Sequence, residues 1–265
     1  MAGMKRTDID HGRAFDWGRA SEDYAKYRDI YPASFYAKLR EAGIGLAGQR
    51  VLDLGTGTGV LPRAMYSHGA RFTGVDISPE QIEQARALSA GMEIEYIAAP
   101  AEDIDFTAGS FDAAAAITCF WYMDRDVVLL KLHGMLKEKG RFAICSMAWL
   151  PAESDIAQGS EALVLKYNPA WMGANWAKRT NSLPEPEWAA PLFRVHQNIV
   201  FHEALPFTRE NWHGRMLACR GIGASSLTTE EIAAFEAEHI AYMQTLPEQF
   251  TVMHQVEMLV LEKNE

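Results

Sequence analysis

Three glycines at alternate positions, Gly55, Gly57 and Gly59, follow the apolar run Val51–Leu54 and precede a helix-like segment. Glycine lets the backbone approach a ligand closely, and the N–H groups at the start of a helix favour ligand atoms that accept hydrogen bonds. In an open α/β sheet, ligands bind at the carboxyl ends of the strands. The turn therefore indicates a small-molecule site at the end of the first strand.

The spacing of this turn separates several kinds of nucleotide-binding loop. The dinucleotide fingerprint G-x-G-x-x-G/A needs glycine or alanine at position 60, where this chain has Val60. The sequence contains no G-x-x-x-x-G-K-[ST] phosphate loop. A triphosphate site is excluded and a nicotinamide-dependent oxidoreductase is disfavoured, whereas the hydroxyls of Thr56 and Thr58 suit a polar ligand tail that is not a phosphate.

A carboxylate stands at the end of the next strand-like run, where Asp76 lies within Gly74–Ser78. An acid at this place can accept hydrogen bonds from both ribose hydroxyls of an adenosine. The alternative role is that of a turn or cap residue. Ser78 already suits the N-cap of the following helix, with Pro79 at N1 and Gln81 at N3 of a capping box. We therefore predict that Asp76 binds ribose.

Strand-like and helix-like segments alternate from Gln49 onward. Apolar runs of suitable length predict strands at Arg50–Leu54, Arg71–Ile77, Glu93–Ala98, Phe111–Thr118, Arg141–Ser146, Val195–His202 and Phe250–Leu261. Helical patterns occur at Leu61–His68, from Ser78 to near Gly91, and at Arg125–Leu136, Arg209–Leu217 and Thr229–Thr245. Two further helices, Tyr24–Arg28 and Pro32–Glu41, are expected to cap the ligand-binding end.

This alternation indicates βαβ units and therefore an α/β fold with a doubly wound, mostly parallel sheet covered by helices on both faces. Four segments are expected along the chain. They are a helical cap (1–48), a ligand-binding core (49–146), an insertion or lid over the carboxyl edge (147–194) and a part that completes the sheet (195–265). The insertion is rich in proline and tryptophan and has poor periodicity.

Composition restricts the partners and the location of the protein. The net charge of −10 argues against nucleic acid, because phosphate binding needs clustered Lys and Arg. Cys119, Cys145 and Cys219 are widely spaced, which predicts buried, reduced thiols in a cytosolic protein. Met1–Arg13 lacks a secretory signal pattern, and the longest weakly polar run, Ala113–Met123, is too short for a membrane span. A soluble, cytoplasmic monomer or homodimer without membrane contact is expected.

Four motifs occur in order, namely DLGTGTG (53–59), GVDIS (74–78), AAPAEDIDFTAGSFDAA (98–114) and LKEKGRFAI (136–144). Together they resemble class I, Rossmann-like S-adenosylmethionine-dependent methyltransferases of the methyltransferase type 11 group. FDWGRASEDYAKYRDIYP (15–32) is similar to the N-terminal part of relatives of trans-aconitate methyltransferases. The resemblance implies seven strands with an antiparallel C-terminal strand, and methyl transfer from S-adenosylmethionine to a small molecule. Transfer of another group from the same cofactor is the nearest alternative.

The resemblance also assigns roles to residues. The turn contacts the methionine moiety, Asp53 orients the turn or reaches the amino group through water, and Ile77 packs on adenine. Many relatives have Asp-Ala-Glu in the third motif, and Pro100 stands at that Asp position here, so the Ala101 backbone and Glu102 are the expected replacements. The predicted cofactor-binding residues are Arg28, Asp53, Gly55, Thr56, Gly57, Gly59, Asp76, Ile77, Gln81, Ala101, Glu102 and Thr118.

The acceptor pocket is predicted from weaker signals, at Tyr24, Trp121, Tyr122 and Arg215. The resemblance implies that Tyr24 lines the methyl group and that Arg28 pairs with the cofactor carboxylate. The alternative is that both residues belong to a surface helix packed on the sheet edge. The rings of Trp121 and Tyr122 could lie against the positively charged sulfonium, or they could be core aromatic residues at a junction between strand and helix. Arg215 and Arg220 suit an anionic substrate or pairing with the surplus acids. The histidines show no metal-ligand spacing, and in-line methyl transfer needs alignment and dry walls more than a catalytic constellation, so no catalytic residue is predicted.

Overall fold

The computed structural model describes residues 6–265, which form two compact units built from separated stretches of the chain. The first unit contains residues 6–30, 148–178 and 202–255, and the second contains residues 31–147, 179–201 and 256–265. Three of the five divisions between them fall inside the last three strands of the chain. The division of the chain into four consecutive segments stays a prediction.

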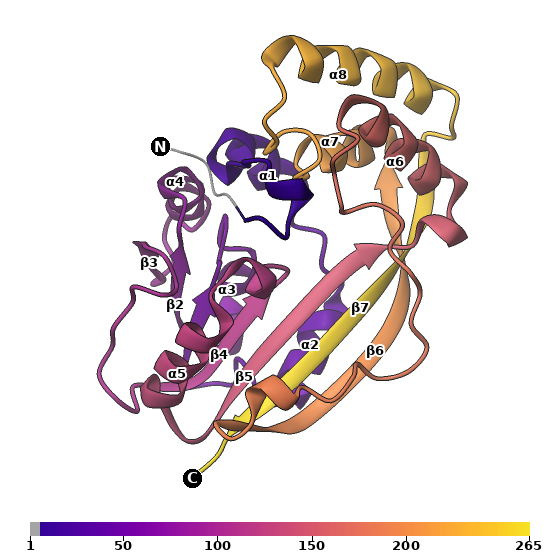
Figure 1. Cartoon of the computed structure of the whole chain (residues 1–265). Helices are drawn as coiled ribbons and strands as arrows, with labels where there is room; N and C mark the ends of the chain where they lie inside the picture. The colour runs from indigo at the N-terminus through magenta and orange to yellow at the C-terminus, as the bar shows by residue number, and fades with distance from the viewer. Residues whose placement is uncertain (1–5) are drawn as a thin grey trace. The chain divides into compact units, whose positions relative to one another are not determined.

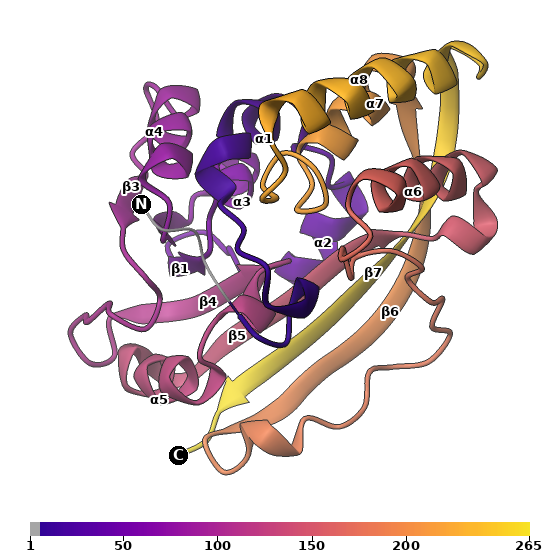
Figure 2. The same ribbon diagram turned by 45° about the horizontal axis from the view of Figure 1, so that its top comes forward.

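A seven-stranded sheet has the order β3-β2-β1-β4-β5-β7-β6 (Figure 1). The pairs β1–β2, β1–β4, β2–β3 and β4–β5 are parallel. The C-terminal strand β7 runs opposite to its neighbours β5 and β6 in Figures 1 and 2. The predicted doubly wound, mostly parallel sheet with an antiparallel C-terminal strand is therefore confirmed. The strands are β1 Arg50–Leu54, β2 Arg71–Asp76, β3 Glu95–Ala98, β4 Phe111–Ile117, β5 Leu136–Trp149, β6 Phe193–Thr208 and β7 Gln249–Lys263.

Side-chain caps begin most of the longer helices, and the helices capped by Asp124, Thr208 and Thr228 begin at their predicted first residues. Asp124, Ser154, Thr208 and Thr228 each accept a backbone N–H two or three residues into the helix, and Thr228 forms a full capping box with Glu231. The helices are α1 Ser21–Tyr27, α2 Ala33–Glu41, α3 Val60–Met65, α4 Pro79–Leu88, α5 Arg125–Met135, α6 Asp155–Tyr167, α7 Arg209–Leu217 and α8 Thr229–Gln244.

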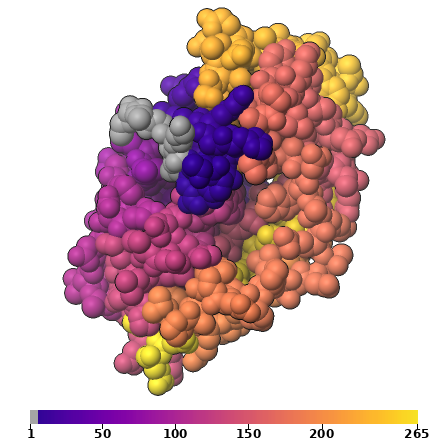
Figure 3. All heavy atoms as spheres, in the orientation of Figure 1, coloured from indigo at the N-terminus to yellow at the C-terminus, as the bar shows by residue number. Residues whose placement is uncertain are grey.

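The core of the second unit lies between the sheet and α5. Buried side chains of β1, β4 and β7 pack there with Val128, Leu129 and Leu132 of α5. β7 is buried along most of its length, and in Figure 3 its yellow atoms are visible only in patches among the orange atoms of the segment that contains β6. β7 is thus an inner strand, which a continuous apolar run predicts.

Helix α6 lies in the segment whose periodicity is poor, and the sequence did not predict it. Its buried residues, Ala157, Ser160, Glu161 and Val164, have helical i, i+3, i+4, i+7 spacing. Two of the four are polar and one is small, so the pattern is invisible to a search for apolar residues. Glu161 is satisfied by Trp149 Nε1 at 2.6 Å and by the Asn175 backbone N–H at 2.9 Å.

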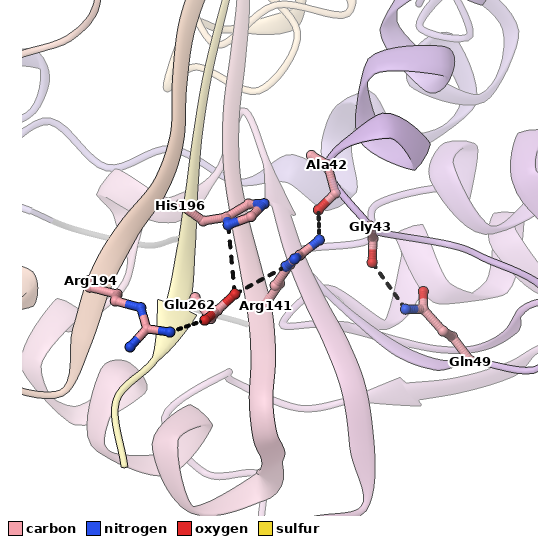
Figure 4. A network of polar contacts seen from close by, with 7 residues as sticks. All are labelled: Ala42, Gly43, Gln49, Arg141, Arg194, His196 and Glu262. Carbon is pink, nitrogen blue, oxygen red and sulfur yellow. Dashed lines mark hydrogen bonds and ion pairs between the residues drawn. The ribbon is translucent and has the colours of Figure 1, made fainter.

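A polar network joins β5, β6 and β7 to the loop after α2 within the second unit (Figure 4). The carboxylate of Glu262 accepts from Arg194 and lies 3.5 Å from Arg141 Nε and 3.6 Å from His196 Nδ1. Arg141 Nη1 also donates to the Ala42 carbonyl at 2.8 Å. Burial works against the charged form of Glu262, but Arg194 and Arg141 hold the pKa of its carboxyl below the ordinary value.

Replacement of Glu262 by glutamine is expected to lower the free energy of unfolding at pH 7 by about 1–2 kcal/mol, since two guanidinium groups lose their shared anion. A carboxyl whose pKa is lowered by folding stabilises the protein above its unfolded-state pKa, and this stabilisation is lost as the pH falls. In urea denaturation, the difference in the free energy of unfolding between wild type and variant should therefore become smaller at pH values below 4.5, the ordinary pKa of a glutamate carboxyl. The control Glu138→Gln changes an exposed residue of β5. Equal losses for both variants at pH 7 would contradict the role of the network.

Candidate functional site

The glycine turn between β1 and α3 has a geometry that excludes other residues. Gly55, Gly57 and Gly59 have φ angles of 62°, 55° and 76°, in the left-handed region that favours glycine. A Cβ atom on Gly55 would lie 2.6 Å from Cys119 Sγ, and one on Gly59 would overlap the hydroxyl of Tyr96. The turn is therefore held by both its backbone conformation and the side chains packed against it.

Asp76 ends β2 beside this turn, as the parallel register of β1 and β2 requires. Its Oδ2 accepts the Gly57 N–H at 2.8 Å and its Oδ1 accepts the Ser78 N–H at 2.9 Å. Burial raises the pKa of its carboxyl, and the two backbone hydrogen bonds oppose that rise. Each oxygen retains a second acceptor direction, so the carboxylate can hold the turn and still bind two hydroxyls.

The start of α4 differs in part from the predicted capping box. Ser78 Oγ accepts the Gln81 N–H at 3.3 Å, and Pro79 is the first residue of the helix, as predicted. The Ser78 N–H, however, donates to Asp76 and not to the Gln81 side chain. The carboxylate at the strand end accepts this N–H, and it ties the second strand to the helix.

Asp53 is 2% exposed and accepts a hydrogen bond from Thr56 Oγ1 at 2.6 Å. Burial raises the pKa of its carboxyl to about 7, the Thr56 hydroxyl opposes the rise, and the charge of Asp76 adds to it. This geometry suits the predicted role of orienting the turn. Thr56 Oγ1 donates to Asp53 and Thr58 is fully buried, and the expectation that these hydroxyls suit a polar ligand tail stays a prediction.

The other predicted residues of the second unit lie at the ends of β2, β3 and β4. Ile77 is 47% exposed and Trp121 is 41% exposed, so both present apolar surface. Thr118, directly after β4, has a φ of 59° and its hydroxyl lies 3.1 Å from that of Tyr31. The remaining members are Gln81 (buried in α4), Ala101 (buried), Glu102 (accepting the Asp124 N–H at 2.6 Å) and Tyr122 (ring centroid 5.6 Å from that of Trp121).

Three predicted residues, Tyr24, Arg28 and Arg215, belong to the first unit. The guanidinium of Arg28 lies 4.7 Å from the centre of the Tyr24 ring and donates to its hydroxyl at 3.3 Å. Arg215 is 3% exposed. Arg220 pairs with Asp10 at 2.6 Å, so pairing with an acid, the alternative left open for it, is what the structure shows.

The sequence did not reveal the contribution of Tyr96. Its ring occupies the space beside both Gly59 and Gly74, and its hydroxyl lies 2.9 Å from Ser89 Oγ. Gly74 of β2 is directly opposite Tyr96 of β3 in the sheet register. An aromatic residue opposite a strand glycine is a recognisable signal, but only once the register is known.

Residues 52–144 match the family model described as a methyltransferase domain. This segment is a methyltransferase domain. An O-methyltransferase of Aspergillus sclerotiorum is 38% identical over 118 residues, which are 41% of this chain and 44% of that protein. A ubiquinone biosynthesis O-methyltransferase of Xanthomonas axonopodis pv. citri (strain 306) is 32% identical over 115 residues, 42% of this chain and 48% of that protein. The chain thus spans about half the length of the curated relatives it matches.

Solved structures agree with the methyltransferase fold. A protein of Anaeromyxobacter dehalogenans, provisionally described as a type II methyltransferase, has a TM-score of 0.57 and 19% identity over 89% of this chain and 97% of its own. A provisionally described methyltransferase of Bacillus halodurans C-125 has a TM-score of 0.53 and 19% identity over 88% of this chain and 100% of its own. At this identity the likeness concerns the fold. The likeness of residues 15–32 to relatives of trans-aconitate methyltransferases stays a prediction.

None of the helices within residues 6–265 has the length and apolar character that crossing a bilayer requires. The same residues contain no group of three or more His, Cys, Asp and Glu side chains arranged to hold a metal ion. Cys145 and Cys219 are buried free thiols and Cys119 is partly buried, so the predicted burial holds for two of the three cysteines.

Proposed function

We propose that the protein binds S-adenosylmethionine through the glycine turn and Asp76 and transfers its methyl group to a small-molecule acceptor. The observation that carries this proposal is the carboxylate of Asp76, which receives the N–H groups of Gly57 and Ser78 and keeps acceptor capacity for two ribose hydroxyls. The match of residues 52–144 to a methyltransferase domain supports it. The cofactor would supply an activated methyl group, so the chain has to bind, orient and exclude water.

Four other predicted cofactor-binding residues suit the same ligand. Ile77 presents an exposed apolar side chain next to Asp76, which fits the face of an adenine. The buried Ala101 and the carboxylate of Glu102 follow the third strand. The resemblance places the acceptor for the adenine amine at this point of the chain. Asp53, whose pKa is about 7, gains a partner if the cofactor ammonium comes near it. We therefore propose all the predicted cofactor-binding residues as the site.

The acceptor is proposed to carry an oxygen nucleophile, because the two curated relatives are named as O-methyltransferases. The net charge of −10 favours a small molecule over a nucleic acid. A cytoplasmic monomer or homodimer remains part of the proposal. Transfer of a different group from the same cofactor is the second candidate, since the turn specifies the donor and not the group that leaves it.

Titration calorimetry of the whole chain tests the proposed function. S-Adenosylhomocysteine, the product form of the cofactor, is expected to bind with one site per chain, and NADH is expected not to bind. Incubation with methyl-labelled S-adenosylmethionine and extracts of small metabolites should then label a small molecule. Binding of NADH without binding of S-adenosylhomocysteine would reject the proposal in favour of an oxidoreductase.

Replacement of Arg28 by methionine is expected to weaken S-adenosylhomocysteine about tenfold, as the loss of one charge-assisted contact predicts. Methylthioadenosine lacks the carboxylate and should bind both proteins equally in the same titration. The control Lys26→Met removes an exposed positive charge from the same helix, where Lys26 pairs with Glu210 at 3.0 Å. Equal losses for both ligands would reject a contact between Arg28 and the carboxylate.

A further inference from the structure

Two buried carboxylates lie beside the glycine turn, and their hydrogen bonds differ. Asp76 accepts two backbone N–H groups, from Gly57 at 2.8 Å and from Ser78 at 2.9 Å. The carboxylate of Asp53, a residue that is 2% exposed, accepts a single hydrogen bond among residues 6–265, from the Thr56 hydroxyl at 2.6 Å. Hydrogen bonds to a carboxylate favour its charged form. The surroundings therefore support a negative charge better on Asp76 than on Asp53.

The hydroxyl of Thr56 is held beside Asp53 by the backbone of the turn. The Thr56 N–H donates to the Val75 carbonyl, and the Thr56 carbonyl accepts the Gly59 N–H, both at 2.9 Å. Gly74 is opposite Asp53 in the sheet register, and a Cβ atom on it would lie 2.7 Å from Thr56 Oγ1. The missing side chain thus leaves room for the hydroxyl. A hydroxyl can donate to a charged carboxylate or to the carbonyl oxygen of the protonated acid, so this contact is compatible with both forms of Asp53.

The other titratable and charged groups around Asp53 come from the neighbouring elements. Burial raises the pKa of the Asp53 carboxyl to about 7, the hydroxyl bonded to it opposes the rise, and the charge of Asp76 on β2 adds to it. Burial also raises the pKa of Tyr96 on β3 and of the Cys119 thiol after β4, so both are neutral at pH 7. The guanidinium of Arg63 on α3 donates to a carbonyl of the turn, and its charge acts on Tyr96. Burial and the charge of Asp76 together therefore favour the protonated form of Asp53.

We propose that the two acids share one negative charge in the ligand-free protein below neutral pH, with the proton on Asp53, and that Asp53 releases this proton when the ammonium group of S-adenosylmethionine binds beside it. The proton passes to the solvent, and the ammonium keeps its three hydrogens. A nearby positive charge favours the charged form of an acid, so the bound ammonium and the ionised Asp53 stabilise each other. This inference rests on the proposed function and adds a linkage between cofactor binding and pH.

The linkage gives the affinity for the cofactor a definite pH dependence. A ligand that binds the ionised form of an acid has to displace the proton, so its affinity is reduced below the pKa of that acid and reaches its full value above it. Because the pKa of Asp53 is about 7, S-adenosylhomocysteine is expected to bind about eightfold more tightly at pH 7.5 than at pH 6.0. Deamino-S-adenosylhomocysteine, which lacks only the ammonium, should gain nothing from the higher pH.

Titration calorimetry of the whole chain in two buffers with different ionisation enthalpies counts the protons released. S-Adenosylhomocysteine is expected to release about 0.9 proton per chain at pH 6.0 and about 0.2 at pH 7.5, the protonated fractions of an acid with a pKa of about 7. The deamino ligand should release none. Asp53→Asn keeps an acceptor for Thr56 Oγ1 and should abolish both the release and the pH dependence. The matched control Asp112→Asn changes a carboxyl that accepts the Arg50 N–H at 2.8 Å and should keep both.

The outcomes separate this linkage from the proposed function. Failure of S-adenosylhomocysteine to bind overturns both. Binding of S-adenosylhomocysteine without proton release at pH 6.0, or with equal release by the deamino ligand, overturns the linkage alone. Proton release that persists in Asp53→Asn assigns the proton to another group and also overturns the linkage. The comparison of the two ligands uses the wild-type protein, so it decides the matter even where the variant does not fold.

Discussion

Replacement of Asp76 by alanine is expected to weaken S-adenosylhomocysteine at least about 100-fold, because hydrogen bonds to a charged group contribute about 1.5–3 kcal/mol each. Two ribose hydroxyls would lose their acceptor in the proposed complex. The turn would also lose the anchor of its Gly57 N–H, which donates to Asp76 at 2.8 Å. Titration calorimetry of wild type and variant measures the change directly.

Asp112 offers a matched control on another strand of the sheet. It accepts the Arg50 N–H at 2.8 Å and the Lys137 ammonium at 2.6 Å, so it also ties backbone and side chain to β4. Asp112→Ala should lower the free energy of unfolding and leave the affinity for S-adenosylhomocysteine unchanged. An Asp76→Ala variant that is folded and binds S-adenosylhomocysteine as wild type does would remove the observation on which the proposed function rests.

Comparison of methylthioadenosine with S-adenosylhomocysteine distinguishes the role of Asp76 from that of Arg28. Both ligands contain the ribose, so Asp76→Ala should weaken the binding of both equally. Only S-adenosylhomocysteine has the carboxylate, so Arg28→Met should weaken the binding of that ligand alone. The two variants together locate the two ends of the bound cofactor along the chain.

The parts of the site that follow from local chemistry were readable from the sequence. The glycines must be glycine because of their φ angles, and Asp76 ends a strand that the apolar pattern predicts. Helix α7 begins at the predicted residue, where Thr208 caps it. Such features depend on a few neighbouring residues, so their physical causes are contained in the segment itself.

The parts that depend on distant contacts were not readable. Cys119 and Tyr96 support the turn only after the sheet register brings them beside it. β5 and β6 extend well beyond the predicted Arg141–Ser146 and Val195–His202, because pairing with β7 continues the ladder where the apolar pattern weakens. Hydrophobic periodicity describes one segment at a time and contains none of this information.

Replacement of Gly55 by alanine is expected to lower the free energy of unfolding by about 3 kcal/mol. Forcing a Cβ atom into the left-handed region costs about 1–2 kcal/mol. Overlap in a packed site costs about 1–3 kcal/mol more, and here the Cβ would lie 2.6 Å from Cys119 Sγ and 2.8 Å from Cys119 Cβ. Urea denaturation measures the sum, and the distorted turn should also weaken S-adenosylhomocysteine.

Gly109 separates the two costs, because its φ of 64° matches the 62° of Gly55 but no atom lies within 4 Å of a Cβ built on it. Gly109→Ala should therefore show only the backbone cost. The additional loss of stability in Gly55→Ala is attributed to the overlap with Cys119. Adding Cys119→Ala should not remove this loss fully, because alanine keeps the Cβ atom. A Gly55→Ala, Cys119→Gly double variant should recover the excess relative to Cys119→Gly alone. Equal losses at Gly55 and Gly109 would show that the turn tolerates the overlap and that its backbone conformation alone requires glycine.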